Sequence, residues 1–283
     1  MTGVQTCALP IWSRDAGDLA LDAYSGRIGT TARFYLRDGV PGVWPAGPRY
    51  MDVNVRASGL VLTWRSLEST WRASVHRTFT RKADGQPLPV RYPFVEVAPG
   101  VGYYQVSQSM PGPGWETVDG IRNTVFTLGV DQALAPDWRL TAEYARMRQH
   151  GSELGSDSTG GYVAVFHTVG HWTPYASWGH LRSNDTTLDW YRRLTQTQLP
   201  SYFPGAATIN AAMRVAGENG YATDQHTWAL GAAYQLDVRS KVKAELARTH
   251  IGEVSRAVDG AAGTEPARDT GVNVWSLKYS FRF

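Results

Sequence analysis

The seven histidines are the side chains in this 283-residue chain best suited to acid–base or metal chemistry. His76 follows Ser74 by two residues, and His226 follows Asp224 by two. A histidine beside a hydroxyl or a carboxylate is the smallest set of groups from which a nucleophilic or general-base site can be built. No surrounding motif supports such a site, because the chain has no GxSxG, HExxH, CxxC or phosphate-binding loop. The sequence therefore predicts no catalytic residue, no metal site and no cofactor, and we expect a protein that is not an enzyme.

The other chemically active side chains are charged residues that alternate with apolar ones. In 270–283 the odd positions from Trp275 onward are apolar and the even positions from Ser276 onward are polar. Strict alternation predicts a β-strand with one apolar and one wet face. The same pattern, in places weaker, predicts ten strands at 27–36, 50–65, 71–80, 122–132, 138–144, 160–169, 172–183, 227–236, 241–246 and 270–283.

The connections between these strands alternate in length. Short connections lie near 66–69, 133–137, 170–171 and 237–240, and long ones at 37–49, 82–121, 150–159, 184–224 and 253–269. This alternation is typical of outer-membrane barrels, whose short turns face the periplasm. Trp64, Trp71, Trp138 and Trp172 flank the short turns, as an aromatic girdle would. We expect an all-β, antiparallel transmembrane β-barrel, with one helix around 209–217 inside a long loop.

Composition agrees with a barrel rather than a helical membrane protein. Mean hydropathy is −0.32, and the longest apolar stretches are far shorter than the roughly 20 residues that a helix needs to cross a bilayer. The formal net charge of +3 is spread along the chain, so a nucleic-acid partner is not expected. A soluble β-sandwich is the competing interpretation, and it would bury its apolar strand faces in a core.

The C-terminal segment 274–283 resembles the insertion signal of Gram-negative outer-membrane barrels, with Tyr279, Phe281 and the terminal Phe283 at alternate positions. The repeat from Arg27 to Phe283 resembles the C-terminal part of a proteobacterial porin. That resemblance implies passive diffusion of small hydrophilic solutes across the cell outer membrane. It implies membrane lipid, lipopolysaccharide and the barrel assembly machinery as partners, and a homotrimer as one assembly. A barrel enzyme of lipase or protease type, or a non-conducting structural barrel, are the alternatives.

The first eleven residues resemble a translated sequencing adapter, which leads us to separate 1–12, adapter-derived or unstructured, from a barrel domain at 13–283. Cys7, the single cysteine, lies in that segment, so we expect the natural chain to be cysteine-free. We also expect the natural N-terminus to be missing. Porins of this type often have sixteen or eighteen strands, so several strands would be absent. An intact barrel of ten or twelve strands is the alternative.

If the apolar face meets lipid, the alternate positions line the lumen. The predicted pore-lining residues are Arg27, Arg33, Arg65, Arg72, Arg139, Glu143, Lys241, Lys243, Glu245, Lys278 and Arg282. Cations outnumber acids in this set, and a passage lined by one sign of charge concentrates the opposite ion. The set therefore predicts anion preference, unless acids in the loops neutralise it.

Loops 82–121 and 184–224 are each about forty residues long, and structureless loops of that length are usually functional. We expect one of them to fold into the lumen and constrict it. The candidates are Arg91, Tyr103, Tyr104 and Glu116 in the first loop, and Arg192 and Arg193 in the second. Aromatic rings beside arginine suit a sugar or an aromatic acid. A lid that packs on its own aromatic residues is the alternative.

Overall fold

The computed structural model describes residues 4–14, 17–220, 222–256 and 258–282. Most of the chain forms one eleven-stranded antiparallel sheet. Its strands are β1 (Val4–Arg14), β2 (Gly17–Leu36), β3 (Gly47–Arg65), β4 (Ser69–Lys82), β9 (Ile121–Ala135), β10 (Trp138–His150), β11 (Ser158–His167), β12 (Trp172–Ser183), β13 (Asp224–Gln235), β14 (Ser240–Ile251) and β15 (Thr270–Phe281).

Each strand pairs with the next in chain order, and β9 follows β4 because β5–β8 belong to a loop. The sheet order runs from β1 at one edge to β15 at the other. The predicted all-β antiparallel fold is confirmed, and all ten predicted strands are present. The additional strand is β1, and β2 begins ten residues earlier than the alternation indicated. The proposed adapter origin of residues 1–12 stays a prediction.

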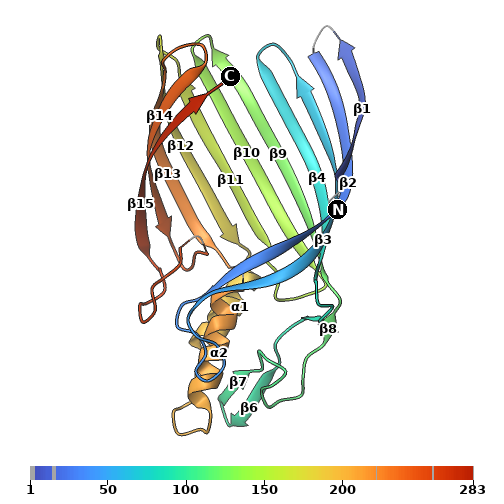
Figure 1. Ribbon diagram of the computed structural model, residues 1–283, viewed down its shortest axis with the longest axis vertical. Helices are drawn as coiled ribbons and strands as arrows, with labels where there is room; N and C mark the ends of the chain where they lie inside the picture. Colours follow the sequence, from blue (N-terminus) through green and yellow to red (C-terminus); the bar gives the residue numbers. More distant parts are fainter. Residues whose placement is uncertain (1–3, 15–16, 221, 257, 283) are drawn as a thin grey trace.

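The long connections gather at one end of the sheet and the short ones at the other (Figure 1). The long-loop end carries helices α1 (Asp185–Gln196) and α2 (Ala206–Glu218) and the short strands β5 (Leu88–Pro89), β6 (Phe94–Ala98), β7 (Val101–Tyr104) and β8 (Thr117–Val118). Helix α2 confirms the helix expected around 209–217. Helix α1 was not predicted. It begins after Asn184, whose side chain caps the backbone N–H of Thr187.

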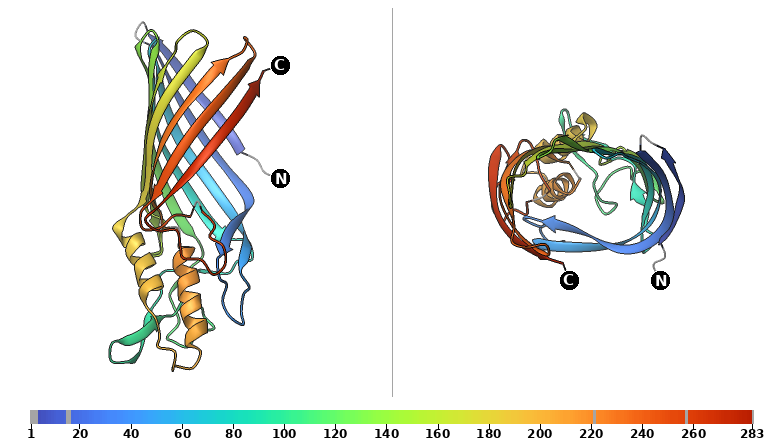
Figure 2. Two further views of the ribbon diagram at one scale, coloured as in Figure 1. Left: turned by 90° about the vertical axis from the view of Figure 1, so that its left-hand side faces the viewer. Right: turned by 90° about the horizontal axis from the view of Figure 1, so that it is seen from above.

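The sheet curves around a hollow, and α2 lies within its outline when the molecule is viewed from above (Figure 2). Leu36 of β2 and Val40 pack with Ala211 and Val215 of α2, which identifies the face that carries Leu36 as the concave one. The opposite, convex face carries large exposed apolar residues, among them Trp275 at 79% exposure. Buried apolar clusters occur at the loop end, where the helices, the loops and the adjoining sheet rim meet.

Phe34 departs from its predicted place. The predicted pore-lining positions Arg27 and Arg33 imply that Phe34, which alternates with them, faces lipid, but Phe34 packs against the cluster formed by Leu36 and α2 on the concave face. The reason is that this end of β2 stands beside the loop helices, so its apolar side chains are buried by protein. Within the described residues, no helix is long and apolar enough to span a membrane.

Candidate functional site: the concave face and the loop cavity

A polar cluster occupies the concave face of β12–β14. Tyr175, Gly231 and Glu245 are direct cross-strand partners, and the Tyr175 hydroxyl donates a hydrogen bond to Glu245. Lys243 Nζ lies 3.0 Å from Glu245 Oε2 and 4.7 Å from the Tyr175 ring centroid. A Cβ at Gly231 would stand 2.2 Å from the Tyr175 hydroxyl oxygen, so only glycine lets the ring lie flat across β13. The cluster fixes the Lys243 charge beside its counter-charge.

The strand register brings most of the predicted pore-lining residues to this concave face. They are Arg65, Arg72, Arg139, Glu143, Lys241, Lys243, Glu245 and Lys278. It also brings three acids that sequence reasoning missed: Asp18, Asp22 and Asp131. Arg139 Nε is 2.5 Å from Asp131 Oδ1, so this predicted cation is paired, as Lys243 is with Glu245. The register also places Arg49 and Lys82 on this face, so its described strand residues comprise five acids and eight cations.

The register removes two residues from the predicted pore-lining set. Arg27 and Arg33 alternate with Ile28 and Phe34 in β2, and they lie on the convex face. Arg33 pairs there with Asp259 at 2.6 Å. Arg282 follows β15, and its backbone N–H donates to the Arg239 carbonyl. Of the predicted insertion signal, Tyr279 and Phe281 are exposed, and Phe283 lies outside the described residues.

A chain of polar side chains crosses the concave face of β2, β4 and β9. The Tyr24 hydroxyl is 2.7 Å from His76 Nδ1, and His76 Nε2 is 2.6 Å from Ser74 Oγ, which is 2.6 Å from Thr127 Oγ1. When Tyr24 donates to Nδ1, the imidazole proton is on Nε2 and points at Ser74. His76 then cannot accept the serine proton, as a general base must. The chain fits a structural hydrogen-bond network.

A cavity of about 610 Å³ lies between the loop segments and the rim of the sheet. Its lining is largely apolar and includes the aromatic side chains Phe34, Trp44, Tyr92, Trp115, Trp190 and Tyr191. Lys82, at the end of β4, is the one charged residue among the described residues that line the cavity, and no ion pair to it is found among them. Such a pocket has the size and the apolar lining typical of a small-molecule site.

Aromatic edges hold one wall of this cavity. The Trp190 ring lies 6.2 Å from Tyr92 and 5.6 Å from Tyr104, with interplanar angles of 87° and 73°. Edge-to-face pairs of this kind stabilise the wall. Burial raises the pKa of Tyr92 to about 12, so its hydroxyl stays neutral at physiological pH. The predicted loop residue Arg193 stacks over Trp190, with its guanidinium carbon 5.5 Å from the ring centroid.

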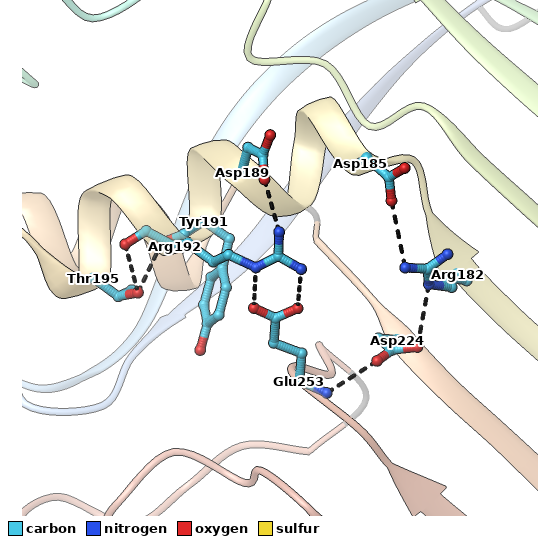
Figure 3. A network of polar contacts seen from close by, with 8 residues as sticks. All are labelled: Arg182, Asp185, Asp189, Tyr191, Arg192, Thr195, Asp224 and Glu253. Carbon is cyan, nitrogen blue, oxygen red and sulfur yellow. Dashed lines mark hydrogen bonds and ion pairs between the residues drawn. The ribbon is translucent and has the colours of Figure 1, made fainter.

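Helix α1, which carries Trp190 and Tyr191, is fixed to the sheet by ion pairs (Figure 3). Arg192 Nε and Nη2 donate to the Glu253 carboxylate at 2.5 and 2.7 Å, and Nη1 donates to Asp189 at 2.7 Å. The hydrogen bonds with Glu253 raise the pKa of Arg192 further above its ordinary value. Arg182, at the end of β12, lies 3.4 Å from Asp185. The predicted candidate Arg192 therefore anchors the cavity wall rather than facing a solute.

The remaining loop candidates divide between packing and solvent. Tyr103 is 3% exposed, and its hydroxyl donates to the Pro111 carbonyl at 2.8 Å. Tyr104 packs against Phe94 as well as Trp190. Arg91 and Glu116 are exposed. The structure thus brings Tyr104 and Arg193 against Trp190, which lines the cavity, and leaves Arg91 and Glu116 at the surface.

The comparisons with known proteins give only weak likenesses. No family model matches the chain, and no curated protein matches it. The KdgM porin in complex with disordered oligogalacturonate is 8% identical, over 94% of this chain and 95% of that chain, with a TM-score of 0.35. OmpT of Vibrio cholerae is 10% identical over 99% and 91%, with a TM-score of 0.43. The ferric enterobactin receptor of Pseudomonas aeruginosa is 12% identical over 94% and 37%, with a TM-score of 0.46. At these TM-scores the likenesses carry no weight for the function of this chain.

Proposed function

We propose that the chain forms the wall and loop cap of an outer-membrane β-barrel channel in a Gram-negative bacterium, and gives small hydrophilic solutes passive passage. The observation that carries this proposal is the contrast between the two sheet faces. The convex face of β13 is apolar from Leu236 to Trp228, about 26 Å along the strand, close to the roughly 25 Å of an outer-membrane apolar band. The concave face at the same level carries Lys243 and Glu245.

The aromatic residues near the short turns support the same orientation. Trp64 and Trp71 are cross-strand partners on the convex face, and Trp172 lies 4.7 Å from Tyr234 in ring-centroid distance. Tryptophan and tyrosine favour the membrane interface, where the ring is apolar and its polar atom stays wet. The long-loop end then faces outward, and the loop cavity is the first site that a solute meets. Membrane lipid, the barrel assembly machinery and a homotrimeric assembly are proposed with this function.

The proposal is tested by thiol accessibility on neighbouring residues of the central strand β10. In a Cys7→Ser background, Glu143→Cys places a thiol on the concave face and Tyr144→Cys places one on the convex face. A charged, membrane-impermeant thiol reagent is expected to label the Glu143→Cys variant in lipid vesicles at least about tenfold faster. Without a membrane, the Tyr144 side chain is 45% exposed. In a water-soluble β-protein the reagent would therefore label both variants at similar rates, and that result would refute the membrane placement.

Conduction is measured separately, in a planar bilayer. Because Asp18, Asp22 and Asp131 join the concave face, we expect a weaker anion preference than the predicted set alone implies. Changing Lys241, Lys243 and Lys278 to glutamate should move the reversal potential towards cations, and the shift should shrink in high salt as screening grows. If the convex-face thiol is protected but no conductance is measured, the protein is a structural barrel and the channel function is excluded.

The loop cavity supports a more specific solute: a ring with a negative charge. Aromatic side chains offer faces on which a ring can stack, and Lys82 offers a cation without an acidic partner among the described residues. Benzoate is therefore expected to change the tryptophan fluorescence of the chain at lower concentration than benzyl alcohol does. Lys82→Met should remove this difference and leave the response to benzyl alcohol unchanged. Equal fluorescence responses to both compounds in the parent chain would count against a role for the Lys82 charge in binding.

A barrel hydrolase is the second candidate, favoured only by the 2.6 Å contact between Ser74 and His76. The network around His76 argues against it, since the Tyr24 hydroxyl occupies the position that a carboxylate takes in hydrolytic triads. Ester hydrolysis that the parent chain shows and Ser74→Ala loses would establish the hydrolase. We expect no hydrolysis by either protein.

A further inference from the structure

Arginines gather on the convex face of β2, β3, β4, β9 and β10, strands that lie side by side in Figure 1. One cross-strand row runs through Arg27, Arg56, Phe79, Arg122 and His150, each the direct partner of the next. The neighbouring row, one step closer to the short turns, contains Ser25, Ser58, Arg77, Thr124 and Arg148. The two rows form one basic patch, which we call the convex basic patch.

The convex basic patch has little negative charge to balance it. Among the described residues, no ion pair involves Arg56, Arg77 or Arg122. The acid on this face of the five strands is Asp52, four residues further along β3 than Arg56 and hydrogen-bonded by Thr31. Like charges directly opposite in a sheet repel each other, as Arg27 and Arg56 do here. The arrangement attracts an anion from outside the chain.

The patch is also hollowed. A cleft of about 410 Å³ is lined by Arg56, Arg77, Arg122 and His150, together with the hydroxyl residues Ser25, Ser58 and Thr124. The guanidinium carbon of Arg122 lies 6.0 Å from the centroid of the Phe79 ring, which supports the side chain in its place. Arginine forks and hydroxyl groups in one cleft suit a phosphate, because guanidinium groups bind phosphate oxygens in pairs.

The level of the patch identifies the source of that phosphate. Two residues further towards the short turns, the same face of β2, β3, β4 and β9 is apolar, with Ala23, Leu60, Val75 and Phe126, whereas β10 carries Arg146 in this row. On those four strands the arginines therefore begin where the apolar residues end, at the loop side. We infer that the convex basic patch binds the phosphate groups of an outer-leaflet glycolipid headgroup, as found in lipopolysaccharide. This inference rests on the membrane placement proposed above.

The test uses the full chain in phosphatidylcholine vesicles, with purified lipopolysaccharide as the probe and its enzymatically dephosphorylated form as the control. The variant Arg56→Gln/Arg77→Gln/Arg122→Gln removes three charges from the patch. The matched control Arg65→Gln/Arg72→Gln/Arg139→Gln removes three charges from the concave face. An arginine near a charged lipid surface contributes roughly fivefold in affinity, so the patch variant should bind about 100-fold more weakly. The concave variant should stay within about twofold of the parent.

Dephosphorylation needs no substitution, so this arm remains valid if a variant folds poorly. The parent chain should bind the dephosphorylated glycolipid much more weakly than intact lipopolysaccharide. Inorganic phosphate at 10 mM should displace little of the intact lipopolysaccharide, because a free ion lacks the acyl chains. Equal binding by parent and patch variant, or equal losses in both triple variants, would overturn the inference. Displacement by inorganic phosphate alone would also overturn it. The thiol labelling of β10 is independent of these arginines, so a failed patch and a failed membrane placement are distinguishable.

Discussion

Arg192 offers the sharpest test of how the loop cavity is held in place. Its guanidinium makes two hydrogen bonds that join α1 to Glu253 and a third to Asp189 within the helix, and α1 supplies Trp190 and Tyr191 to the cavity wall (Figure 3). Arg192→Met keeps the length of the aliphatic stem and removes all three hydrogen bonds. The substitution leaves the Glu253 carboxylate, 21% exposed, without its cation.

The expected cost lies between two limits. Exposed ion pairs contribute about 0–1 kcal/mol, and removal of one partner from a buried pair costs about 3–5 kcal/mol. Arg192 is 37% exposed and bidentate, so we expect about 2 kcal/mol for local opening of α1. That energy corresponds to roughly 30-fold faster amide hydrogen exchange in α1 when exchange follows the open population. Arg192→Lys, which keeps the charge but not the fork, should fall between the parent and Arg192→Met.

Asp185 provides the control on the same helix. Its carboxylate is 83% exposed and 3.4 Å from Arg182, so Asp185→Asn should change the opening of α1 by no more than about 0.5 kcal/mol. Hydrogen exchange followed by mass spectrometry on peptides from α1 distinguishes the two variants. If Arg192→Met and Asp185→Asn exchange at the same rate as the parent, the ion pairs do not hold the helix, and packing of Leu188 and Tyr191 alone fixes it.

Three further outcomes are expected. Burial raises the folded-state pKa of Tyr92 to about 12, so the stability that the neutral Tyr92 hydroxyl contributes is complete below pH 10 and is lost as the pH rises through 12. In a series of unfolding midpoints measured against pH, Tyr92→Phe should remove this loss. Gly231→Ala should destabilise the chain by about 1–3 kcal/mol in denaturant unfolding, because the new Cβ meets the Tyr175 hydroxyl, and the same substitution should cost much less in a Tyr175→Ala background. Deletion of Phe283 should reduce insertion into outer membranes, measured by fractionation, more than it changes the conductance of molecules that do insert.

Strands that cross the proposed membrane could be predicted from the sequence with ease. In β15, Trp275 and Leu277 alternate with Ser276 and Lys278 without exception, because one face meets lipid and the other meets water. Loop elements could not be predicted in the same way, since α1 is mostly polar and its buried side is short. A usable signal was present nonetheless: the capping Asn184 followed by Leu188, Tyr191 and Leu194 at helical spacing.

The concave-face acids were missed for a related reason. Asp18 and Asp22 lie in the first half of β2, where the apolar partners are Leu19 and Leu21 and the alternation is short. Asp131 lies in β9, one of the strands whose alternation of apolar and polar residues is weak. The charge balance of a barrel lumen depends on every strand, and the acids of one omitted half-strand lower its net positive charge. Register, which sequence alternation does not give, was needed to count these acids.

The reversed face of Arg27 and Phe34 has a physical cause that also locates the membrane. Near the short turns, β2 presents Leu19 and Leu21 on the convex face and Asp22 on the concave face. A strand that leaves lipid beside a protein cap exchanges the environments of its two faces: the convex face now meets water and headgroups, and the concave face meets packed loops. On this part of the strand, apolar residues lie on the concave face and charged residues on the convex face. This is the reverse of the arrangement within the apolar band, although the alternation itself continues.

The same inversion occurs in β14, at the other side of the sheet. Val242, Ala244 and Leu246 are convex and apolar, and the convex face then continues with Arg248 and His250. The concave face changes in the opposite sense, from Lys243 and Glu245 to Ile251, which is fully buried. A charge on the lipid face costs about 2–4 kcal/mol at the bilayer midplane and about 0–1 near the interface. On each of these two strands the exchange of polarity marks the outer boundary of the proposed apolar band, and on β2 the patch residue Arg27 lies just beyond that boundary.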